Sequence, residues 1–260
     1  MLVGWQLLSN EWYYLEPSAT ASIPQGAMVT GWKTINSVKY YFAADGRMII
    51  EQPTSTKTLS VKGYTDDYFD AQYGQNYAGT LLNQIQTPYK YVWNINFTTG
   101  YTYQTPAFPN SLCSSSSINY CSDAPNSSCS NSTVSPYHHR NANKNLNYFK
   151  ENIPEYSADI KVAFTSTPLC GVWSGSHATG ILGVTFNLDS YTYITELPSS
   201  SQNVHVRIIQ HEMSHMFGAH DGACTSNQSC VMKGSFDNRP LSISDIWCDN
   251  CKEDFSRNAQ

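Results

Sequence analysis

Aromatic and apolar residues form short runs in the first part of the chain, separated by Asn and Gly turn signals, and this pattern predicts β-hairpins. The runs recur along the chain. Gly4-Trp5 returns as Gly31-Trp32, and Trp12-Tyr13-Tyr14-Leu15 returns at the same spacing as Lys39-Tyr40-Tyr41-Phe42. Repeats of this size stack on one another, so we expect a module of β-hairpin repeats over residues 1–52.

After residue 52 the repeats stop, and we assign 53–260 to a second unit with longer elements. Its apolar residues alternate as in β-strands in four segments: Thr58–Tyr64, Tyr91–Phe97, Asp159–Phe164 and Ile181–Phe186. Four further segments are typical of helices: Tyr77–Gln86, Asn145–Ile153, the stretch after Ser199–Ser201, and Trp247–Phe255. Segment 109–136 is a polar loop. We therefore expect an α+β fold in which helices cover a mixed twisted sheet.

Composition limits the classes of function. Only 13% of the residues are charged, and the formal net charge is −5. Nucleic acid is not an expected partner, because phosphate binding needs clustered Lys and Arg. No apolar run reaches the ~20 residues that cross a bilayer. The first residues lack the basic and apolar regions of a signal peptide, so we interpret the chain as a fragment of a longer protein.

The eight cysteines leave two interpretations open. An even number in a polar chain favours disulfides and an oxidising compartment. Alternatively, Cys248-x-x-Cys251 supplies half of a zinc site, although the chain has no second pair at that spacing. We favour disulfides, and expect one between Cys224 and Cys230, which flank a short polar loop.

The chemistry is concentrated in His211-Glu212-Met213-Ser214-His215, which lies on a predicted helix. Residues four apart share one face of a helix, so His211 and His215 can bind one Zn²⁺. Glu212 can reach a metal-activated water without being a ligand, which is the role of the general base in the HExxH motif. Gly218 follows where the helix needs a residue with positive φ to turn.

The stretch from His211 to Met232 resembles the metzincin zinc metalloproteases, whose HExxHxxGxx motif is followed by a third ligand and a Met. In most metzincins the third ligand is a His where this chain has Asp221. Snapalysin-like enzymes have an Asp there, whereas adamalysin-like enzymes have a His-Asp pair with the His as ligand. The third ligand is therefore Asp221 if the spacing is kept, or His220 if the loop is one residue shorter, and we favour Asp221. The resemblance makes Met232 the Met-turn beneath the metal.

By this resemblance, residues 53–260 form a metzincin-type catalytic domain, a zinc-dependent endopeptidase. Glu212 would take a proton from the metal-activated water as it attacks a peptide carbonyl. The peptide substrate would lie extended along a sheet edge near Gly180–Phe186.

The N-terminal runs resemble the choline-binding, or cell-wall-binding, repeats of bacterial surface proteins. The resemblance implies that Trp5, Trp12 and Tyr14 line a cage closed by Trp32, which would hold choline by cation–π contacts. Some relatives bind glucans, and the rings could also only pack the hairpins together. The combined expectation is a secreted bacterial zinc protease tethered to the cell wall. The alternatives are a surface adhesin with little activity, or a zinc amidase acting on peptidoglycan peptides.

Overall fold

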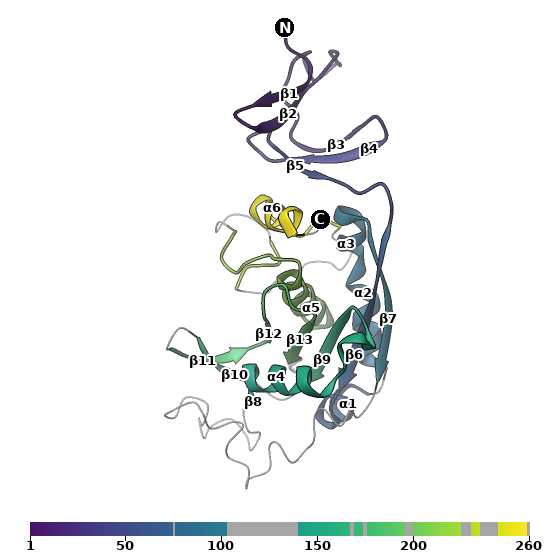
Figure 1. Cartoon of the computed structure of the whole chain (residues 1–260), viewed down its shortest axis with the longest axis vertical. Coiled ribbons are helices and arrows are strands. Elements are labelled where there is room, and N and C mark those ends of the chain that lie inside the picture. Colours follow the sequence, from purple (N-terminus) through teal and green to yellow (C-terminus); the bar gives the residue numbers. More distant parts are fainter. Residues whose placement is uncertain are drawn as a thin grey trace.

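A computed structural model of the chain describes residues 1–74, 76–102, 140–166, 169–173, 176–195, 200–224, 230–234 and 244–258 (Figure 1). The expected polar loop 109–136, with three of the cysteines, lies outside these residues.

The N-terminal region consists of antiparallel hairpins, as predicted. Its strands are β1 (Gly4–Leu8), β2 (Glu11–Leu15), β3 (Gly31–Ile35), β4 (Val38–Phe42) and β5 (Met48–Glu51). β1 pairs with β2, and β3–β4–β5 form a second sheet. The turns Ser9-Asn10 and Asn36-Ser37 have positive φ at both residues, as two-residue hairpin turns require. The turn chemistry therefore fixes the register of both hairpins.

A five-stranded mixed sheet forms the centre of the second unit, in the order β12-β13-β9-β6-β7. Its strands are β6 (Lys57–Thr65), β7 (Ile95–Thr102), β9 (Ile160–Thr165), β12 (Gly183–Thr185) and β13 (Tyr191–Thr195). All neighbours are parallel except β12, which pairs antiparallel with β13 and forms one edge. A smaller sheet contains β8 (Arg140–Asn141), β10 (Leu169–Trp173) and β11 (Ser176–Ile181).

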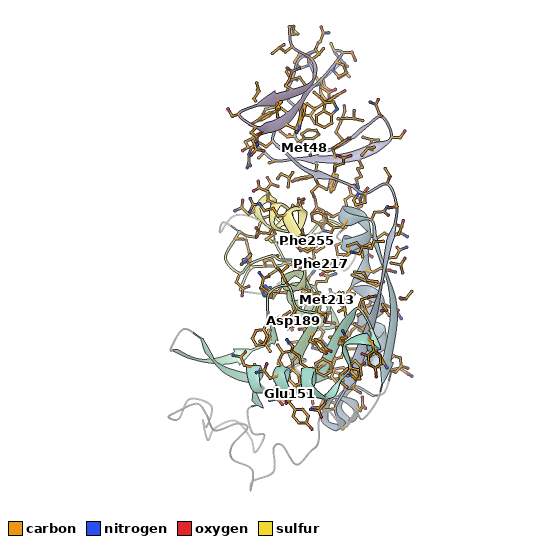
Figure 2. All side chains as sticks on the ribbon, viewed as in Figure 1. Met48, Glu151, Asp189, Met213, Phe217 and Phe255 are labelled. Carbon is orange, nitrogen blue, oxygen red and sulfur yellow. A yellow bond between two sulfur atoms is a disulfide. The ribbon has the colours of Figure 1, made fainter. Side chains whose placement is uncertain are left out.

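Helices cover both faces of the five-stranded sheet. They are α1 (Asp67–Tyr73), α2 (Tyr77–Gln84), α3 (Gln86–Trp93), α4 (Ala142–Asn152), α5 (Gln202–Met216) and α6 (Asp249–Asn258), with a 3-10 turn at Glu155–Ser157. The larger core lies between the sheet and α2, α3, α5 and α6, and a smaller core lies under α4. Figure 2 shows Phe217, Phe255 and Met213 in the larger core, below the hairpins. The predicted mixed sheet with helices is confirmed.

The start of one predicted strand is wrong. Residues 91–93 were expected to open a strand, but α3 continues to Trp93 and β7 begins only at Ile95. The reason is tertiary: Tyr89, Val92 and Trp93 lie at helical spacing and all are buried in the larger core. Asn94, with φ 55°, ends the helix in the left-handed conformation that Asn tolerates.

The hairpins sit at one end of the molecule, where β5 lies beside α6 (Figure 1). Within the described residues, no helix is both long and apolar enough to cross a membrane.

Candidate active site

Helix α5 carries the predicted motif through the larger core. It begins after Ser201, and its residues Val206, Ile208, Ile209 and Met213 are fully buried. It ends at Met216, with Phe217 as its C-cap, and Gly218 then turns the chain at φ +92°. The predicted positive φ of Gly218 is confirmed.

Both imidazoles of the predicted motif on α5 are fixed by backbone carbonyl groups. His211 Nδ1 lies 2.9 Å from the Val231 carbonyl oxygen, and His215 Nδ1 lies 2.8 Å from that of Ala219. A carbonyl oxygen can only accept, so each Nδ1 carries the hydrogen and donates it. Each Nε2 is then the atom available to a metal, an arrangement common to histidine ligands in metal sites.

Asp221 completes the set. Its Oδ1 lies 3.1 Å from His211 Nε2, and its Oδ2 lies 3.7 Å from His215 Nε2. One ligand atom from each residue lies within 4.8 Å of the other two. Two imidazole nitrogens and a carboxylate oxygen are a donor set that fits Zn²⁺. His220 instead turns toward Asn187, at 3.3 Å, and Asp254, at 3.4 Å, so the structure brings Asp221 rather than His220 to the two imidazoles.

The charges of this group are coupled. Burial lowers the pKa of His211, but the hydrogen bond with Asp221 and the charges of Glu212 and Asp221 outweigh it and raise the pKa to about 9. Burial raises the pKa of Asp221, but the bond to His211 and the charges of the neighbouring histidines lower it overall. A bound cation would displace the His211 proton and take over the pairing with the carboxylate.

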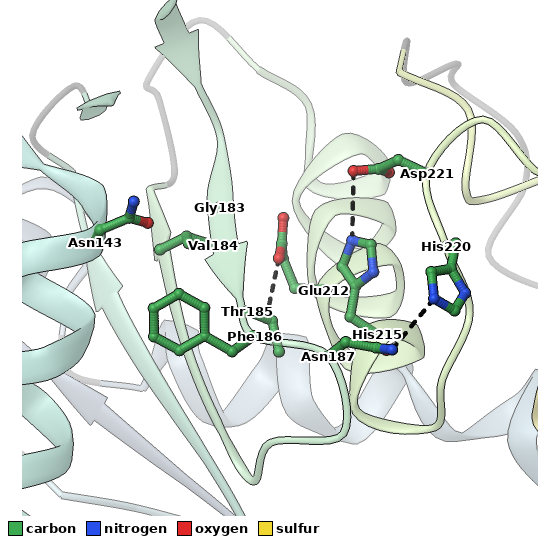
Figure 3. A pocket seen from close by; sticks show the side chains of 10 residues that line it. All are labelled: Asn143, Gly183, Val184, Thr185, Phe186, Asn187, Glu212, His215, His220 and Asp221. Carbon is green, nitrogen blue, oxygen red and sulfur yellow. Dashed lines mark hydrogen bonds and ion pairs between the residues drawn. The ribbon is translucent and has the colours of Figure 1, made fainter. Parts of the chain in front are cut away.

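Glu212 faces a cleft of about 580 Å³ that also contains His215 and Asp221 (Figure 3). Its side chain lies against the edge strand β12. Thr185 donates a hydrogen bond of 2.9 Å from Oγ1 to Glu212 Oε2, and Gly183 leaves room for the side chain. Burial raises the pKa of Glu212, although the nearby histidines and the Thr185 bond counteract it. A buried carboxylate of this kind is suited to accept a proton.

Sequence reasoning missed Gly183, Thr185 and Asn187 as members of the site. The segment was expected to border the substrate, but no local motif marks residues that contact a helix far along the chain. Met232 is fully buried in the larger core, directly after Val231, whose carbonyl oxygen holds His211. This position is compatible with the Met-turn interpretation.

Four cysteines form a second group near the Met232 segment. The sulfur atoms of Cys224, Cys230, Cys248 and Cys251 all lie within 4.8 Å of one another. Cys224 is bonded to Cys248, so the expected Cys224–Cys230 disulfide is wrong. The reason is that the start of α6 brings two distant cysteines beside the first two. Cys230 and Cys251 are buried and lie outside this disulfide, and the contact with Cys230 raises the pKa of Cys251. With that disulfide reduced, four thiolates at these distances would form a donor set for tetrahedral zinc.

The structure brings together three of the four rings of the expected cage. Trp5 lies 6.1 Å from Trp12 and 5.2 Å from Tyr14, measured between ring centroids. Trp32 lies elsewhere, on the face of the second hairpin that contacts α3 and the segment before α6. It shares this face with Tyr41, its cross-strand partner. Tyr40 takes its place beside Trp5, at 4.8 Å.

One comparison with known proteins concerns the N-terminal region. Residues 3–18 and 30–48 match the model of the cell wall binding repeat family, of the choline-binding type. The N-terminal region therefore carries repeats of this kind. No curated protein matches the chain.

Two solved structures are similar to the chain at a low level. One is archaemetzincin from Methanopyrus kandleri, with 13% identity, a TM-score of 0.49, and coverage of 80% of this chain and 98% of that chain. Another is metalloproteinase-II from Bacteroides fragilis, with 12% identity, a TM-score of 0.46, and coverage of 82% of this chain and 57% of that chain. At these levels the likeness assigns no function.

Proposed function

We propose that the protein is a zinc-dependent endopeptidase of the metzincin type, held at a bacterial cell wall by its N-terminal repeats. One observation carries the proposal: two histidines with anchored Nδ1 atoms and Asp221 converge on one point beside the carboxylate of Glu212. A structural ion-pair cluster would not need both imidazoles held in the same tautomer by backbone carbonyl groups.

The roles of the residues follow from their positions. When bound, zinc would activate water and polarise the peptide carbonyl. Glu212 accepts a proton from the attacking water and delivers it to the leaving amine. Thr185 holds one oxygen of Glu212, so the other oxygen is free to face the cleft. Asp221 places a negative charge in the ligand set and leaves the centre less positive than three histidines would.

The edge strand β12 supports an extended substrate. It pairs on one side with β13 and lines the cleft with Gly183, Val184 and Thr185. A peptide can add to such an edge through main-chain hydrogen bonds, which position the scissile bond independently of its side chains.

The repeats support a wall polymer as the second partner. We infer an extracellular, wall-associated location from the matched repeats, with choline or a glycan as the polymer group bound. An adhesin that keeps zinc without turnover, and an amidase of peptidoglycan peptides, are the competing functions.

The zinc-loaded protein should hydrolyse an internally quenched peptide and casein, and a chelator should abolish this activity. Glu212→Gln should keep its zinc and lower turnover by at least ~10²-fold, the lower end of general-base effects. Glu151→Gln, at an exposed position on α4, is the matched control and should be fully active. Activity on purified wall but not on casein would identify an amidase, and zinc without either activity would identify an adhesin.

A further inference from the structure

The second repeat, β3–β5, turns its two faces toward different parts of the molecule. On one face Tyr40 packs against Trp5 of the first repeat. On the other, Trp32 and Tyr41 face each other across the β3–β4 pair, with ring centroids 5.0 Å apart. The equivalent pair in the first repeat is Trp5 and Tyr14, at 5.2 Å. The two repeats thus carry the same aromatic pair, and what covers each pair decides what it can bind.

Lysine side chains of the chain itself cover the second pair. Lys252 Nζ lies 3.7 Å from the centroid of the Tyr41 ring, and its side chain is 3% exposed. Lys39 Nζ lies 4.2 Å from the centroid of Trp32 and 3.6 Å from that of Tyr91 on α3. Aromatic cages recognise quaternary ammonium ligands through the same cation–π contacts. The ring faces that an external cation would need are therefore already in use.

The polar edges of the same rings bind Asp245, in the segment before α6, and Asp249, the first residue of α6. Trp32 Nε1 donates to Asp245 Oδ2 at 3.3 Å, and the Tyr41 hydroxyl donates to Asp249 Oδ1 at 2.8 Å. Lys252 Nζ also lies 3.3 Å from Asp245 Oδ2. The two rings, the two carboxylates and the Lys252 ammonium group thus form one connected network of hydrogen bonds, an ion pair and a cation–π contact.

Contacts along the rest of the hairpin extend this interface. Arg47 pairs with Glu253 at 3.0 Å, and Ser256 donates a hydrogen bond of 2.9 Å to the Ile49 carbonyl oxygen. Ile50 is 2% exposed and belongs to the larger core of the second unit. The second repeat is therefore joined to α6 by polar contacts and by a shared apolar core.

The first repeat differs at the same positions. Trp12 is 42% exposed. Across the described part of the chain, no Lys or Arg lies over the rings of Trp5, Trp12 or Tyr14. We propose that the second repeat is a docking module whose ligand is α6 of its own chain, and that only the first repeat binds an external cationic ligand. The role of the first repeat rests on the proposed wall tether, whereas that of the second rests on these contacts alone.

The docking connects the second repeat to the candidate active site. Helix α6 carries Cys251 of the four-cysteine group and Asp254, which contacts His220 at the cleft. A repeat that holds α6 in place therefore stabilises the side of the cleft that His220 lines. The catalytic unit then begins before β3. A domain boundary at residue 53 would separate the second repeat from the helix α6 that it stabilises.

The test uses the zinc-loaded full chain. Tyr41→Phe removes the hydroxyl group that binds Asp249 and keeps the ring. Tyr13→Phe is the matched control in the first repeat, because within the described residues its hydroxyl makes no hydrogen bond. We expect Tyr41→Phe to lower the melting temperature by about 3–6 °C, as loss of a hydrogen bond to a charged group does in a chain of this size, and Tyr13→Phe to leave it unchanged.

Choline titrations test the division between the repeats. Trp5→Ala should weaken choline binding at least about tenfold, whereas Trp32→Ala should leave it intact and lower the melting temperature. Equal melting temperatures for Tyr41→Phe and Tyr13→Phe would overturn the docking role, as would loss of choline affinity in Trp32→Ala. If the unchanged protein binds no choline, the proposed choline tether fails, and the melting comparison still decides the docking role.

Discussion

Gly183→Ala tests whether the edge strand holds the proposed base in place. A Cβ atom built on Gly183 lies 2.5 Å from Glu212 Cγ and 2.6 Å from its Oε1. Ordinary contacts of this kind are 3.4–4 Å, so the two groups must separate by about 1 Å. Glu212 is only 5% exposed and is bonded to Thr185, so it has little room to yield without losing that bond.

The expected loss follows from this displacement. Misplacing a reacting group by ~1 Å can cost about 10²-fold in rate, which corresponds to roughly 2.7 kcal/mol of transition-state stabilisation. We therefore expect kcat/KM for a quenched peptide to fall about 10²-fold in Gly183→Ala. Zinc content should not change, because the three heavy atoms nearest the added Cβ all belong to Glu212 and none belongs to a proposed ligand.

The control is Gly100→Ala on β7 of the same sheet, where nothing lies within 4 Å of an added Cβ. It should keep its activity within about twofold, since surface substitutions away from special features have small effects. Zinc content by elemental analysis and melting by circular dichroism accompany each assay. If folded, zinc-loaded Gly183→Ala retains the activity of Gly100→Ala, Glu212 is not held by this contact and the assignment of the base fails.

Three further predictions concern the metal groups. Asp221→Ala should lower zinc affinity by more than about 100-fold, beyond the usual cost of losing a supporting group, and His220→Ala should have a much smaller effect; the reverse order in a zinc titration would make His220 the ligand. Because Cys224 is bonded to Cys248, the protein should hold about one zinc per chain, and Cys251→Ser should leave this content unchanged; a content near two that falls to one in Cys251→Ser would place a second zinc in the four-cysteine group. In protein stripped of metal, the raised pKa of His211 contributes stability that is present below about pH 6.5 and is lost as the pH rises through about 9; urea unfolding should show this decrease, and stability that rises over this range would contradict the pairing with Asp221.

The parts of the fold that the sequence predicted depend on short-range signals. Turn residues such as Asn36-Ser37 mark the hairpins, and the spacing of His211 and His215 already places them on one helical face. The missed features depend on contacts between distant segments. Trp32 meets Asp245 across 213 positions of sequence, and no pattern near either residue indicates that partner.

The same limit explains the cysteines and the edge strand. The expected Cys224–Cys230 pair was chosen because the two are close in sequence, but the fold offers Cys248 as a nearer partner. Gly183 and Thr185 read as ordinary strand residues until the strand is placed beside α5. Local chemistry indicated the proposed metal ligands, whereas the groups that contact Glu212 became visible only in the tertiary structure.

The interface between the second repeat and α6 has a consequence for where the protein could act. A protease joined to its anchor by a flexible linker samples a wide volume around that anchor. The amino-acid sequence of the target then determines which peptide bond is cleaved. Here the second repeat shares the larger core with the catalytic unit, and the first repeat packs on the second (Figure 1). If the first repeat binds a wall polymer, the cleft is held at a fixed distance from that polymer. Targets would then be chosen by how far they project from the wall as well as by their sequence.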